Sequence, residues 1–99
     1  MSEVSIITRI TNTYNLNKSS DILTYEMVKD FLCRMKNYTK DELQIVQHIA
    51  LDMKKRKVMG VSLLSLAHYY ARAIEKVYNN NTPHKQLVKV CYYEIKNKL

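Results

Sequence analysis

The residues of this chain best suited to chemistry are four consecutive cations close to its only glycine, Gly60: Lys54, Lys55, Arg56 and Lys57. Ammonium and guanidinium groups bind phosphates and carboxylates. The dipole of a helix stabilises a cation at its C-terminus by roughly 0.3–1 kcal/mol, which does not account for four that repel one another. We therefore expect the run to contact an anionic partner. A solvated helix end and a nuclear import signal, whose composition KKRK shares, are the alternatives.

Basic residues are concentrated in the second half of the chain. Residues 1–52 contain 6 Lys/Arg and 7 Asp/Glu, a net charge of −1, whereas residues 53–99 contain 10 and 2, a net charge of +8. Such asymmetry indicates an anionic partner, which is nucleic acid, an acidic protein or a membrane surface. We expect DNA or RNA to contact eight of these cations: Lys54, Lys55, Arg56, Lys57, Arg72, Lys76, Lys85 and Lys89.

Tyrosine provides eight of the nine aromatic residues and forms two adjacent pairs, at 69–70 and 92–93. Neighbours on a helix point about 100° apart, so one of each pair can be buried while the other is exposed. An exposed tyrosine suits a protein interface or stacking on unpaired bases. We expect Tyr70 in the core and name Tyr69, Tyr92 and Tyr93 as possible interface residues. The alternative is that their rings pack in the core with the hydroxyls at its rim.

The five histidines and cysteines are dispersed along the chain: Cys33, His48, His68, His84 and Cys91. None of them has the close spacing that zinc ligands show, and no Gly-rich loop offers an oxyanion site. We expect no metal, no cofactor and no enzymatic activity. Both cysteines are expected to be small buried hydrophobes. With no signal peptide and no apolar run long enough to span a membrane, we expect a soluble protein of the reducing cytoplasm.

Scarcity of chain breakers favours long helices, since the chain has only one Gly and one Pro. The sequence predicts one all-α domain over residues 1–99, with an N-terminal segment and polar connector at 1–20 and a helical core at 21–99. We expect a compact bundle or orthogonal array of four main helices after a short, weak N-terminal helix. Residues 3–15 also show strand-like alternation, but nothing else in the chain offers a strand to pair with.

The four main helices are placed by their start and stop signals. The first begins near Ser20 or Thr24 and ends by residues 37–38. The second begins at a capping box and ends at Gly60, which fits the left-handed position after a helix. Its box is Thr39–Glu42, and its inner face is Leu43, Val46, Ile49, Ala50 and Met53. The third begins after Ser62, and the fourth runs from Thr82–Pro83 to the C-terminus.

A helix, a glycine turn and a second helix around Gly60 invite comparison with the DNA-binding helix-turn-helix. The comparison fails at the turn, because Arg56 occupies the position four before the glycine where tight packing requires a small residue.

We still expect a small non-enzymatic regulatory or accessory protein that binds nucleic acid. The alternative is a protein-binding module, such as a regulator of a transcription factor, an immunity protein or a chaperone-like adaptor. Such a module docks an acidic partner or forms a homodimer. Cations clustered on one face favour nucleic acid, and an exposed apolar patch rimmed by cations favours a protein.

Overall fold

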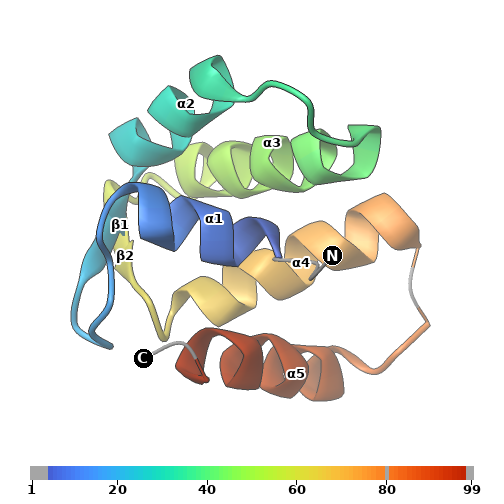
Figure 1. Ribbon diagram of the computed structural model, residues 1–99. Helices are drawn as coiled ribbons and strands as arrows, with labels where there is room; N and C mark the ends of the chain where they lie inside the picture. Colours follow the sequence, from blue (N-terminus) through green and yellow to red (C-terminus); the bar gives the residue numbers. More distant parts are fainter. Residues whose placement is uncertain (1–4, 80, 98–99) are drawn as a thin grey trace.

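Helices dominate the part of the chain that the computed structural model describes, residues 5–79 and 81–97. The elements are α1 (Ile6–Thr13), β1 (Ile22–Thr24), α2 (Tyr25–Arg34), α3 (Lys40–Lys55), β2 (Gly60–Ser62), α4 (Leu66–Tyr78) and α5 (His84–Lys96). From α2 to α5, each helix packs against the next in an antiparallel layer, and α1 lies in front of α3 and α4 (Figure 1). The prediction of a mostly helical domain is confirmed in part, because the described residues form five helices, a short first one and four longer ones, together with a small two-stranded sheet.

The two short strands correct the expectation of a purely α-helical domain. β1 and β2 pair in antiparallel register, with Leu23 opposite Val61, and both of these side chains are buried. Three residues are too few to show the alternation by which strands are found in sequence. Because β1 precedes α2 and β2 follows α3, the ladder joins the two ends of the α2–α3 hairpin.

Helix α1 confirms the short N-terminal helix. The Ser5 side chain caps it by accepting a hydrogen bond from the Thr8 amide at 3.2 Å. Ile7 and Ile10 are completely buried, so the helix is held by its apolar face despite its low propensity. At its end, the Tyr14 hydroxyl donates a hydrogen bond to Asp30 of α2. Burial, followed by this carboxylate, raises the pKa of Tyr14 to about 12.

The predicted capping box is confirmed at the start of α3. Glu42 donates its amide to the Thr39 hydroxyl at 3.1 Å, and the Glu42 carboxylate accepts from the Thr39 amide at 2.9 Å. Helix α2 begins after Thr24, the second of the two expected starts, but ends at Arg34, earlier than expected. The predicted caps of the last two helices were wrong. Ser62 pairs in β2, so α4 begins only at Leu66 with Ser65 in the cap position, and Pro83 rather than Thr82 occupies the cap position of α5, which begins at His84. Residues 98–99 lie outside the described residues.

Lys57, rather than Gly60, takes the left-handed position after α3. Its φ is 57°, and the Val58 amide donates to the Met53 carbonyl at 2.9 Å, which closes the helix end. Gly60 has no positive φ and lies in β2, so its prediction as a helix stop was wrong. A Cβ atom on Gly60 would lie 2.6 Å from Cγ2 of Ile22 on the opposite strand, so a larger residue here would require the Ile22 side chain to shift.

Lys57→Gly is expected to raise the free energy of unfolding by about 0.5–1 kcal/mol, because glycine adopts the left-handed conformation without steric cost. Lys57→Ala is the control, since it removes the charge but keeps Cβ, and it should give no gain. Urea denaturation of the three proteins measures the difference. Equal stabilisation by both variants would show that charge repulsion, not backbone conformation, limits stability here.

Two side chains of the predicted core are exposed instead. Leu43 lies at the edge of the buried face of α3, and Ile45 is buried in its place. This shift follows from packing of α3 between α2 and α4, which widens its buried face. Cys33 is exposed, which corrects its prediction as buried, whereas Cys91 is buried as expected. Burial, followed by the charge of Glu94, raises the pKa of Cys91 to about 12, so its thiol stays protonated at neutral pH.

Candidate functional site

A cleft of about 500 Å³ lies between α3 and α4, on the face where the ends of several basic side chains meet. We call it the basic cleft, and its lining is His48, Leu51, Asp52, Lys55, Arg56, Arg72 and Lys76. It contains four of the eight cations predicted to contact an anion. A ligand in the basic cleft would therefore contact both central helices of the layer.

Helical spacing explains how these side chains share one opening. His48, Asp52 and Arg56 are each four residues apart, so they follow one line along α3 to its C-cap. Arg72 and Lys76 have the same spacing on α4. Because α3 packs directly on α4, the two lines of side chains face each other across the basic cleft.

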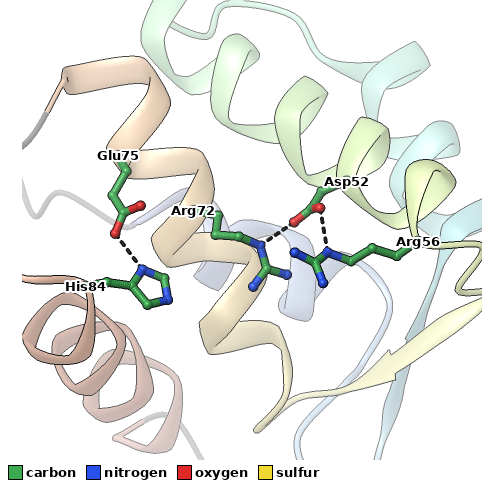
Figure 2. A network of polar contacts seen from close by, with 5 residues as sticks. All are labelled: Asp52, Arg56, Arg72, Glu75 and His84. Atoms are coloured by element: carbon green, nitrogen blue, oxygen red, sulfur yellow. Dashed lines mark hydrogen bonds and ion pairs between the residues drawn. The ribbon is translucent and has the colours of Figure 1, made fainter.

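Asp52 joins the two helices through both arginines. Its Oδ1 accepts a hydrogen bond from Nε of Arg56 at 2.8 Å, and its Oδ2 accepts one from Nε of Arg72 at 2.6 Å (Figure 2). Partial burial works to raise the pKa of Asp52, but the hydrogen bonds from Arg72 and Arg56 outweigh it and hold this pKa below the ordinary value. The carboxylate is therefore ionised at neutral pH and fixes the position of both guanidinium groups.

Arg72 is held from a second side by an aromatic ring. Its guanidinium carbon lies 4.7 Å from the ring centroid of Tyr69, a cation–π distance. Tyr69 itself is only 8% exposed, so its expected exposure was wrong. The reason is that α4 packs against α3 on one side and α5 on the other, which buries more than a single stripe. Tyr69 therefore contacts the guanidinium of Arg72 with its ring and exposes little of its side chain to a partner.

The basic cleft is strongly positive. Lys55 and Lys76 are exposed, and neither makes an ion pair or a hydrogen bond with any residue in the described ranges. Four cations against the single carboxylate of Asp52 leave a formal charge of +3, without counting His48. That carboxylate is already occupied by two arginines, so little negative charge is left to repel an incoming anion.

Comparisons with family models, curated proteins and solved structures gave no match. The chemistry of the basic cleft therefore has to be inferred from its own geometry.

The other four predicted cations lie outside the basic cleft. Lys54 and Lys57 are exposed at the end of α3, next to Lys55 and Arg56 but not in the lining. Lys85 and Lys89 are exposed on α5, on the side away from the buried line that includes Cys91. The structure thus divides the predicted set into a convergent half and a dispersed half.

Tyr92 and Tyr93 differ in exposure, as expected for neighbours on a helix. Tyr92 is half-buried, with Nζ of Lys96 5.8 Å from its ring centroid, and the two tyrosine rings meet edge to face. Tyr93 is 57% exposed on the outward face of α5. Their role as interface residues remains a prediction, and Tyr93 is the one accessible to a partner.

Sequence reasoning missed His48, Leu51 and Asp52 as parts of the site. A signal was present, because His48 and Asp52 precede Arg56 at intervals of four residues on the same helix. Nothing in the sequence indicated that Asp52 would also reach Arg72, since that contact depends on how α3 packs on α4.

A second polar contact fixes the neighbouring helix pair. His84, the first residue of α5, bonds through Nδ1 to the Glu75 carboxylate of α4 (Figure 2). This contact keeps Glu75 turned toward α5, so it does not enter the lining of the basic cleft.

Within residues 5–79 and 81–97, no group of three or more His, Cys, Asp or Glu side chains is arranged so that it could hold a metal ion. In the same residues, no helix is both long and apolar enough to cross a membrane.

Proposed function

We propose that the protein binds nucleic acid and that the basic cleft contacts its phosphates. The observation that carries the proposal is the convergence of four cations from two helices on one opening: Lys55, Arg56, Arg72 and Lys76. Cations scattered for solubility do not converge in this way. Contacts of this kind position a protein on the phosphate backbone and are largely independent of base sequence.

The composition of the lining favours nucleic acid over a protein partner. Among the described residues that line the basic cleft, Leu51 is the one with an apolar side chain, and it is 61% exposed. A protein interface has an apolar, aromatic-rich centre within a polar rim, whereas charged residues predominate in the lining of the basic cleft. We propose a non-enzymatic regulatory or accessory role, because the lining offers cations, two of them held in place by Asp52, that suit the binding of an anion.

A salt series tests the proposal. Fluorescently labelled DNA and RNA of mixed sequence should bind the wild-type protein with micromolar or better affinity at low salt. Release of counterions from about four phosphates predicts a slope of about −3 to −4 in log K against log salt concentration. A folded wild-type protein that binds neither DNA nor RNA at low salt would refute nucleic-acid binding.

A second candidate function rests on the outward face of α5. Tyr93 and Val90, which is 55% exposed, lie beside the exposed Lys85 and Lys89. An apolar and aromatic patch with cations at its margin is the arrangement expected for docking an acidic protein. This candidate uses a different helix from the basic cleft, so variants of α5 and of the basic cleft can distinguish the two.

A further inference from the structure

We propose that the basic cleft takes a terminal phosphate monoester, the phosphorylated end of a nucleic-acid strand, between the guanidinium groups of Arg56 and Arg72. This inference rests on the proposed function and specifies which part of the nucleic acid occupies the site. It is carried by the way in which a single carboxylate holds both arginines.

The geometry leaves the ends of both guanidinium groups available to a ligand. Each arginine uses Nε for Asp52, and each Nε bonds to a different carboxylate oxygen. One terminal nitrogen of each guanidinium group points away from Asp52, and another lies between the two groups (Figure 2). Among the described residues, these nitrogens have no ion-pair partner beyond Asp52. Both arginines line the basic cleft, so their free donors point into one space.

The spacing of the two groups suits a phosphate. A single carboxylate already bridges them through its two oxygens, at 2.8 and 2.6 Å. The oxygens of a phosphate are spaced much like those of a carboxylate, so a phosphate on the opposite side can bridge the terminal nitrogens. Planar guanidinium groups bind phosphate oxygens in pairs, which fixes orientation as well as charge.

Charge distinguishes a strand end from a position within the strand. An internal phosphodiester carries one negative charge and two free oxygens, whereas a monoester carries about −1.5 to −2 at neutral pH and three free oxygens. The basic cleft has a formal charge of +3, and Lys55 and Lys76 flank the two arginines. A terminal phosphate satisfies more of these donors than an internal one.

Asp52 acts here as a positioning residue. Without it, two guanidinium groups this close would repel each other and move apart. Removing its charge therefore has two opposite consequences. Attraction for any polyanion rises because the basic cleft becomes more positive, but the fixed pair of donors that recognises a monoester is lost.

The test compares strands that differ only at one end. Labelled single strands of the same sequence carry either a phosphate or a hydroxyl at the 5′ end, with a second pair for the 3′ end, and binding is followed by fluorescence anisotropy. We expect the wild-type protein to bind a phosphorylated end about tenfold more tightly than the hydroxyl end, the effect of charge-assisted hydrogen bonds to one added anionic group.

Asp52→Asn should reduce this preference to less than about twofold while leaving the affinity for the hydroxyl strand equal or higher, because the net charge increases. Asp41→Asn is the matched control, since Asp41 lies in the first turn of the same helix, outside the basic cleft. It makes the same change in net charge and should keep the tenfold preference. Retention of the preference in Asp52→Asn would overturn the positioning role.

Arg56→Lys provides a variant with little risk to the fold, because the Arg56 side chain is exposed. It keeps the charge but not the planar pair of donors, so the affinity for the phosphorylated strand should fall much more than the affinity for the hydroxyl strand, and the preference should be lost. Equal binding of both strands by the wild type would overturn recognition of the terminal phosphate by Arg56 and Arg72, but it would not contradict the proposed binding of nucleic acid. Binding of neither would overturn both. Competition by a free 5′-nucleotide as strong as by the phosphorylated strand would reassign the site to mononucleotides.

Discussion

Replacing Lys55 and Lys76 together by glutamate should lower the affinity for nucleic acid by about 100-fold near 0.1 M salt. The substitutions change the formal charge of the basic cleft from +3 to −1, which turns attraction for phosphate into repulsion. Neither lysine pairs with another residue in the described part of the chain, and both are exposed. The variant should therefore fold normally, which circular dichroism and thermal unfolding can verify before binding is measured.

The matched control is Lys85→Glu combined with Lys89→Glu on α5. It makes the same change in net charge outside the basic cleft, so only long-range attraction is altered. Since the Debye length is about 10 Å at 0.1 M salt, the loss should be a few-fold at most. An α5 variant that loses as much affinity as the cleft variant would show that total charge, or α5 itself, carries the binding. The outward face of α5 would then become the preferred site.

Ile10→Ala should lower the free energy of unfolding of the whole domain by about 2–5 kcal/mol, the usual cost of truncating a buried isoleucine. Ile10 is completely buried and belongs to the same core as the residues of α3 and α4. Urea denaturation followed by circular dichroism measures the loss. A loss of this size would show that the short helix α1 unfolds together with the rest of the domain.

Ile22→Ala makes the same chemical change in a side chain that is 46% exposed at the edge of β1. Its cost should be well below that of Ile10→Ala, at about 1 kcal/mol or less. Similar small losses at both positions would mean that α1 detaches without unfolding the remainder. In that case the packing of α1 into the common core would not contribute to global stability.

Local signals in the sequence located the helices. The Thr39–Glu42 capping box and the Thr24 cap act on their own first turns, so neighbouring residues suffice to identify them. The β1–β2 ladder could not be found this way, because Leu23 and Val61 meet only after α2 and α3 have packed. The prediction that Gly60 ends a helix failed for the same reason, because the side chain that limits the space at this position is Ile22, which lies on the opposite strand.

The candidate site shows the same division between local and long-range information. The cations were evident in the sequence, but which of them converge depends on the packing of α3 on α4. Lys55 and Lys76 lie in the basic cleft, whereas Lys54, adjacent to Lys55, does not. Nothing in the sequence distinguishes Asp52 from the other acidic residues, because its contact with Arg72 depends on the packing of the two helices. Net charge per segment predicts an anionic partner, and the fold shows which of the cations lie together.

The closed end of α3 has an entropic consequence for binding. The chain after Lys55 is tied at both sides, by the Val58 amide bonded to Met53 and by the Met59 carbonyl bonded to the Tyr25 amide at 2.8 Å. A disordered basic tail with the same residues would lose about 1–2 kcal/mol per residue in backbone freedom when a ligand ordered it. Here folding has already fixed that backbone, so a ligand needs to order only the side chains of the four consecutive cations, residues 54–57.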